Sequence, residues 1–95
     1  MIVTTTPEIA GKTIVEYKGI VFGEVLTRMK MGWTTAGVIA EYEAEMIKAK
    51  RAAINKMIDS AAKIAANAVV GVDFDFQSIS QGIYISATGT AVVVA

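Results

Sequence analysis

Two aspartates, Asp73 and Asp75, have the spacing that most directly suggests chemistry in this sequence. They stand two residues apart in a segment that alternates apolar and polar side chains, and residues two apart in a β-strand share a face. Glu16, on the charged face of another predicted strand, could join them. Carboxylate oxygens suit hard cations such as calcium, magnesium and manganese. The alternative is that these acids solvate an exposed sheet face and pair with Lys18.

Soft metals require thiolate or imidazole ligands, and the chain has neither cysteine nor histidine. The remaining soft donors are methionine thioethers. Met46 and Met57 fall on an apolar helical stripe, where methionine more often fills a core, while Met29 and Met31 lie in a connecting segment. We therefore expect no tight site for zinc, copper or nickel.

Trp33 is the single tryptophan and stands in the same connecting segment. Its ring could be a stacking platform for a flat ligand such as a flavin or a nucleobase. The more common role of such a residue is to pack on its neighbours, here Met29 and Met31. Trp33 is thus the one candidate cofactor-binding residue, and the identity of any cofactor stays open.

The sequence contains no signature of an enzyme. Its serines have no histidine to activate them, and the glycines at 19 and 23 are not followed by the lysine of a phosphate-binding loop. Nine basic and nine acidic residues cancel, which gives no electrostatic reason to expect binding to nucleic acid or anionic lipid. No run reaches the roughly 18 apolar residues of a membrane span. We expect a cytoplasmic protein.

The element that organises the rest is a helix over about residues 41–66, which contain neither proline nor glycine. Thr34 or Thr35 could cap its start, and Asn67 is a plausible left-handed residue at its end. Charged side chains occupy one face. The other face is an apolar stripe with a spacing of three or four residues, made of Ile39, Tyr42, Met46, Ala49, Ala53, Met57, Ala61 and Ile64.

Three segments, 12–26, 69–80 and 83–94, alternate with period two and are predicted strands, the last two joined by a turn at Gln81–Gly82. Residues 1–6 form a short edge strand or an arm. In the long strand, Tyr17 is expected to share a face with Val21, and Glu16 with Phe22. In the next strand, Val70 is expected to share a face with Val72.

These elements predict one α+β domain over residues 1–95, with a long amphipathic helix packed on an antiparallel sheet of about three long strands. The order of the main elements is βαββ. The hydrophobic content of 54% exceeds the ~45–50% of ordinary globular chains. Ile20 and Phe22 also give the second face of the sheet apolar character. We therefore expect another copy of the chain to cover part of this surface.

The sequence resembles the YbjQ-like family of small prokaryotic proteins, which carries a heavy-metal-binding label. The most specific matching piece is Ala68 to Asp73 (AVVGVD) after the amphipathic helix. Other matches are Thr4 to Thr6, Gly19, Val21, Gly23, Glu24, the helical stripe, and Gly89 to Val92. The resemblance implies a fold like that of dodecin subunits and a ring-shaped homo-oligomer, a pentamer. The chain departs from the family in having Lys50 for arginine, Ala65 for glycine, and a shorter segment between Glu24 and Tyr42.

Two functions remain in view. The first is a non-enzymatic, homo-oligomeric binding or scaffold protein with sites at subunit interfaces. The alternative is a carrier of a small molecule or a flavin-type ligand, less readily an enzyme, built at the same interfaces.

Overall fold

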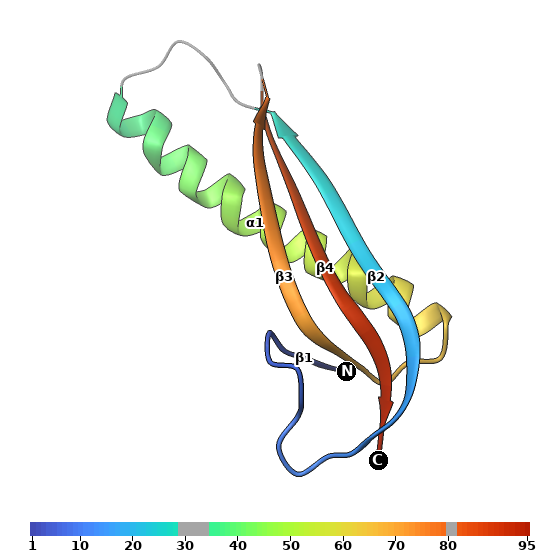
Figure 1. Ribbon diagram of the computed structural model, residues 1–95. Coiled ribbons are helices and arrows are strands. Elements are labelled where there is room, and N and C mark those ends of the chain that lie inside the picture. Colours follow the sequence, from blue (N-terminus) through green and yellow to red (C-terminus); the bar gives the residue numbers. More distant parts are fainter. Residues whose placement is uncertain (29–34, 80–81) are drawn as a thin grey trace.

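The structure is a computed structural model that describes residues 1–28, 35–79 and 82–95. For residues 35–40 it describes the backbone alone. Its elements are β1 (Ile2–Val3), β2 (Ile14–Arg28), α1 (Thr35–Lys63), β3 (Ala68–Ile79) and β4 (Gly82–Val94). The strands form one sheet in the order β1-β3-β4-β2 (Figure 1). The three long strands are antiparallel, and β1 pairs in parallel with β3. The predicted α+β fold is confirmed, with the N-terminal segment forming a short edge strand.

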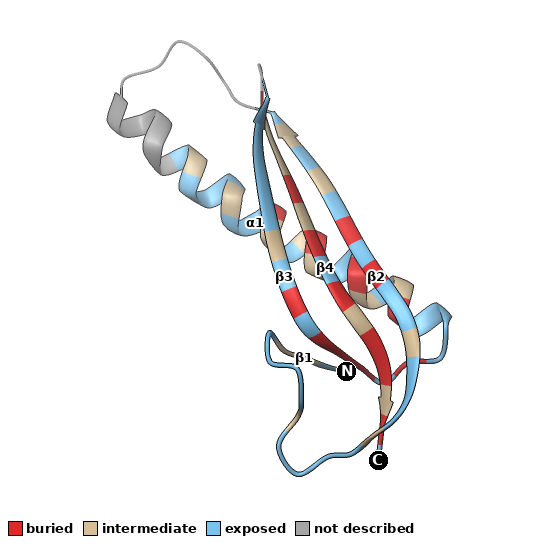
Figure 2. Ribbon diagram, viewed as in Figure 1, coloured by how far each residue is buried: buried red, intermediate tan, exposed pale blue. Residues whose placement is uncertain are grey.

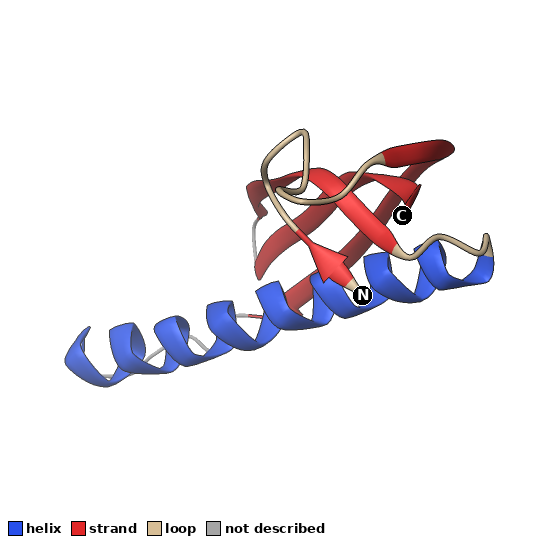
Figure 3. Ribbon diagram, turned by 90° about the horizontal axis from the view of Figure 1, so that it is seen from below, coloured by secondary structure: helices blue, strands red, loops and turns tan. Residues whose placement is uncertain are grey.

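Helix α1 lies across one face of the sheet, and its first turns extend past the edge of β3 (Figures 1 and 3). At ~1.5 Å per residue, its 29 residues span ~43 Å. Ala49, Ala53, Met57 and Ala61 are buried against the sheet, as the apolar stripe predicts. Figure 2 shows this core between the C-terminal half of α1 and the strands. Within the described ranges, no helix has the length and apolar character needed to cross a membrane.

Gly23 on β2 allows the helix to approach the sheet closely. A Cβ at this position would lie 2.7 Å from the backbone nitrogen of Met57, and it would also meet the backbone of Ala53. Backbone atoms cannot swing aside as a side chain does, so this position requires glycine. The ammonium group of Lys56 donates to the backbone carbonyl of Glu24 at 3.0 Å and joins the same two elements.

Two register shifts in β2 reverse part of the predicted alternation. They lie between Ile14 and Glu16 and between Tyr17 and Gly19, and Gly19 has a φ of 132°. A bulge adds a residue to one strand, so the side chains before it change face. Tyr17 pairs with Val92, on the face away from the helix, and Glu16 pairs with Val93 on the helix side. The predicted faces of Tyr17 and Glu16 are therefore wrong.

A similar irregularity in β3 separates Val70 from Val72. Gly71 between them has a φ of 62°, in the left-handed region that favours glycine. Val72 joins the helix-side core, whereas Val70 joins a second cluster on the opposite face. The predicted shared face of Val70 and Val72 is wrong for this reason. The N-terminal segment fixes the bulge, because the Gly71 amide donates to the Thr6 carbonyl at 2.9 Å.

The second cluster closes one end of the sheet face that the helix leaves free. Its buried members come from β3 and β4, and Ile9 and Ile14 pack against them from the N-terminal segment. The buried residues are Ala68, Val70, Val92 and Val94.

Helix α1 ends in a Schellman motif. The Ala66 amide donates to the Ala61 carbonyl and the Ala65 amide to the Ala62 carbonyl, both at 3.1 Å. Ala65 is the left-handed residue, with a φ of 61°, so the prediction of Asn67 for this role is wrong. Asn67 instead holds the end of β4: its Nδ2 donates to the Val94 carbonyl at 2.9 Å, and its Oδ1 accepts from the Val94 amide at 2.7 Å.

Candidate functional site

The candidate site is the part of the sheet that neither the helix nor the N-terminal segment covers. Strand register places side chains from β2, β4 and β3 in rows across it, such as Glu24, Ser86 and Asp75. We call this surface the open face. Its residues are Tyr17, Ile20, Phe22, Glu24, Leu26, Asp73, Asp75, Gln77, Tyr84, Ser86 and Thr88.

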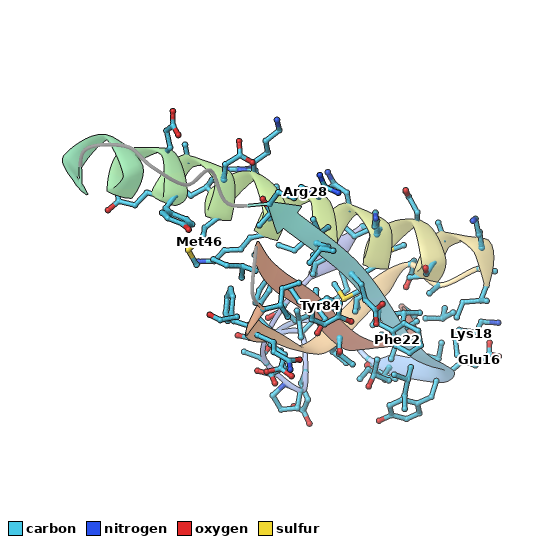
Figure 4. The ribbon with its side chains drawn as sticks, turned by 90° about the horizontal axis from the view of Figure 1, so that it is seen from above. Glu16, Lys18, Phe22, Arg28, Met46 and Tyr84 are labelled. Atoms are coloured by element: carbon cyan, nitrogen blue, oxygen red, sulfur yellow. The ribbon has the colours of Figure 1, made fainter. Side chains whose placement is uncertain are left out.

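Three large apolar residues of β2 project from the open face. Ile20 is 72% exposed, Phe22 58% and Leu26 60%. Figure 4 shows Phe22 and Tyr84 on the side of the sheet away from the helix. Single exposed apolar residues are ordinary, but a row of them on one surface is typical of an interaction site.

The open face is also acidic, because it carries Glu24, Asp73 and Asp75. Hydrogen bonding to Glu24 raises the pKa of Tyr84, and partial desolvation and the negative charges of Glu24 and Asp75 act in the same direction. A raised pKa favours the neutral Tyr84 hydroxyl, which keeps its proton and can act as a hydrogen-bond donor. This arrangement can bind a partner through apolar contact and through cationic groups that meet the acids.

The predicted carboxylate group is only partly brought together. Asp73 and Asp75 do share a face, which they also share with Glu24. Glu16 is on the other face because of the bulges in β2, and it pairs with Lys18 at 3.1 Å (Figure 4). The expectation that Glu16 could join the two aspartates is therefore wrong. In the part of the chain that the structure describes, no three acidic side chains converge as a metal site would require.

Glu24 and Tyr84 are the open-face residues that the search for site residues missed. The signal was present for Glu24, since the alternation of the long strand places it on the same face as Phe22. Tyr84 lies on the polar face of the last predicted strand, and only the pairing of β2 with β4 brings it beside Glu24.

Of the remaining candidate residues, some lie outside the described residues and others lie within them. Trp33, Met29 and Met31 lie outside the described residues. Met57 is fully buried in the helix-side core, which agrees with core filling, and Met46 is half-buried on α1.

One helix on one face of a mixed four-stranded sheet, with the other face acidic and apolar, defines a small two-layer α+β domain. Over residues 1–95, the sequence matches the YbjQ family, whose description reads "Putative heavy-metal-binding". The chain belongs to this family.

Curated relatives align over nearly their full length. UPF0145 proteins of Acetivibrio thermocellus and Clostridium kluyveri are each 43% identical over 105 positions that cover 99% of both chains. A UPF0145 protein of Listeria welshimeri is 43% identical over 99% of this chain and 96% of its own. These alignments are longer than the 95 residues present here, so the relatives contain additional residues.

A solved structure has the same fold. It is a protein of unknown function from Pediococcus pentosaceus, assigned to the DUF74 family, with a TM-score of 0.74 over 100% of this chain and 98% of the other. At 17% identity, this likeness concerns the fold alone.

The donor atoms of this chain do not fit the metals that the family description names. Heavy metals favour sulfur and imidazole ligands, and this sequence offers only thioether sulfur and carboxylates. Of the thioethers in the described ranges, that of Met57 is enclosed by the core.

Proposed function

We propose that this protein is a non-enzymatic, homo-oligomeric binding or scaffold protein whose sites form between subunits. The observation that carries the proposal is the open face, where the side chains of Ile20, Phe22 and Leu26 are each more than half exposed to solvent. Fully burying such a side chain from complete exposure contributes roughly 1.5–3 kcal/mol, and covering the exposed part of each of these three would contribute a large share of that. A second subunit is the partner that is present wherever the protein is made.

The shape of the subunit supports this proposal. Its radius of gyration is 15.9 Å, whereas a compact domain of this length has about 12 Å. Its dimensions are 52 × 22 × 16 Å, because one long helix and three long strands lie side by side with little chain left to wrap them. Assembly would cover surface that a single chain leaves open.

We propose five copies per ring, a number that rests on the family resemblance. Light scattering coupled to size exclusion tests the assembly directly. Since one chain is 10.0 kDa, a pentamer gives about 50 kDa. A single species of several subunits supports the proposal, and a count other than five corrects only the number. A monodisperse monomer at micromolar concentration would overturn it.

The second candidate function, a carrier of a flavin-type ligand, makes a separate prediction. Its one candidate contact, Trp33, lies outside the described residues. Protein purified without added ligand would then show visible absorbance beyond the tryptophan band. A spectrum accounted for by the single tryptophan and three tyrosines favours the scaffold.

We also propose a cytoplasmic location, as expected from the sequence. Fractionation of the producing cells, followed by detection of the protein in each fraction, tests it.

A further inference from the structure

Helix α1 carries a second apolar surface beside the one that packs on its own sheet. Its apolar members are Ile47, Ile54 and Ile58, and Arg51 lies between the first two. The four residues are spaced four, three and four apart, so they form one stripe. We call it the isoleucine stripe. Ile47 is 56% exposed, and Ile54 and Ile58 are half-buried. None of them belongs to the buried core, so the subunit itself leaves this stripe without a complete partner.

We propose that the isoleucine stripe of one subunit packs on the open face of the next. This inference rests on the proposed homo-oligomer and names the two surfaces that form it. Each sheet would then lie between two helices, its own on one face and that of a neighbour on the other. The arrangement repeats between subunits the helix-on-sheet packing that exists within each one.

The two surfaces match in length. From Ile47 to Ile58 the stripe spans eleven residues of helix, or about 16 Å. From Ile20 to Leu26 the apolar row spans six residues of strand, or about 20 Å. Both surfaces also lie on the long elements of the fold, where neither depends on a loop for its position.

The two surfaces are also complementary in charge. The open face carries the acids Glu24, Asp73 and Asp75. The stripe has one charged member, Arg51, at its centre. Two open faces in contact would bring like negative charges together, and two stripes would bring like positive charges together. Charge therefore favours contact between unlike surfaces over either symmetric pairing.

Contact between two different surfaces is heterologous, and it closes into a ring when the rotation between subunits divides a full turn. A symmetric contact through one surface would stop at a dimer. The proposed contact thus explains how one small chain could form a ring without a second kind of interface.

Cysteine cross-linking tests the contact, because the chain contains no cysteine of its own. The variants are Phe22→Cys on the open face and Ile54→Cys on the stripe, produced separately and together in one cell, then treated with a short bis-maleimide. We expect covalent dimers when the two variants are co-produced and none from either variant alone. The double variant, with both cysteines in every chain, should form a ladder that ends at the ring.

Asp59→Cys is the matched control for Ile54→Cys, since Asp59 lies on the charged face of the same helix. Combined with Phe22→Cys, it should form no dimer. Dimers from Phe22→Cys alone would show that two open faces meet and would overturn the inference. So would equal cross-linking of the Asp59 and Ile54 variants.

Light scattering on the same samples distinguishes the two proposals. If the wild-type protein is a monomer, the proposed homo-oligomer itself fails. If it is an oligomer and the Phe22–Ile54 pair does not cross-link, the homo-oligomer stands and only the assigned contact is wrong.

Discussion

At the scale of single residues, Ala65 holds a conformation that costs an L-residue about 1–2 kcal/mol. Its φ of 61° is required by the Schellman motif that ends α1. Glycine adopts this conformation freely but loses more entropy on folding. We expect Ala65→Gly to stabilise the protein by about 1 kcal/mol, measured by urea denaturation.

Ala62→Gly, three residues earlier in the same helix, is the matched control. Ala62 is exposed and helical, so glycine there should destabilise the protein by about 0.5–1 kcal/mol. Opposite signs for the two substitutions are the expected result. A loss of stability in both would show that Ala65 is not left-handed in solution.

Glu24 and Tyr84 give a prediction in alkaline solution. The raised pKa of Tyr84 means that its neutral hydroxyl stabilises the fold below the ordinary value of 10.0, and this contribution disappears as the pH rises through the folded pKa. In a background with Tyr17→Phe and Tyr42→Phe, the ultraviolet absorbance of tyrosinate reports Tyr84 alone.

In that background, Glu24→Ala should lower the midpoint of the Tyr84 titration, because it removes the hydrogen bond and a nearby negative charge. Glu41→Ala, an exposed acid on the helix, should leave the midpoint unchanged. An unchanged midpoint in the Glu24 variant would mean that the two side chains do not interact.

At the scale of elements, period-two alternation was sufficient to predict all three long strands, and the spacing of apolar residues predicted the buried face of α1. Alternation failed where a bulge intervenes. Gly19 and Gly71 mark two of these places, but a glycine in a strand indicates a bend without giving its direction or the residue added. Tyr17 and Glu16 were therefore assigned to the wrong face.

The same bulges explain how much of the site was predictable. The shared face of Asp73 and Asp75 follows from their spacing alone, since they stand beyond the bulge in β3. Glu16 stands between the two bulges of β2, so its face depended on information that the alternation does not contain. The position of Tyr84 beside Glu24 required the register between strands, which a single sequence leaves open.

Asn67 links two elements and gives the prediction at this scale. Its side-chain amide makes two hydrogen bonds to the backbone of Val94 and so fixes the end of β4 to the start of β3. Asn67→Ala removes the partners of the amide and the carbonyl of Val94, a buried residue. The free energy of unfolding should fall by about 1–3 kcal/mol, measured by thermal or chemical denaturation.

Asn55→Ala is the control, because Asn55 is exposed on the helix and alanine is the better helix former. It should leave stability unchanged or slightly higher. If Asn67→Ala behaved in the same way, the hydrogen bonds to Val94 would contribute nothing to the fold.

At the scale of the whole molecule, the fold uses long elements where short ones would make a rounder subunit. A 29-residue helix on three long strands covers one sheet face and leaves much of the other exposed in the subunit. The N-terminal segment closes one end of that second face and adds β1 to an edge. The surface that remains is the open face, which the proposed homo-oligomer would cover.

The proposed homo-oligomer predicts that stability depends on protein concentration. For a homo-oligomer, unfolding includes dissociation, so a tenfold increase in concentration adds on the order of 1 kcal/mol per subunit. Phe22→Glu places a charge in the proposed contact, where burial without a partner is costly. Because Phe22 is 58% exposed in the subunit, we expect this variant to fold as a less stable monomer whose Tm does not change with concentration.

Val15→Glu is the matched control, since Val15 lies on the same strand and is 59% exposed but stands outside the open face. It should assemble as the wild type does and keep the concentration dependence of Tm. Calorimetry over a range of concentrations, with light scattering on each sample, compares the two variants. Loss of assembly in the Val15 variant and not in the Phe22 variant would place the contact between subunits at the other end of β2, away from the open face.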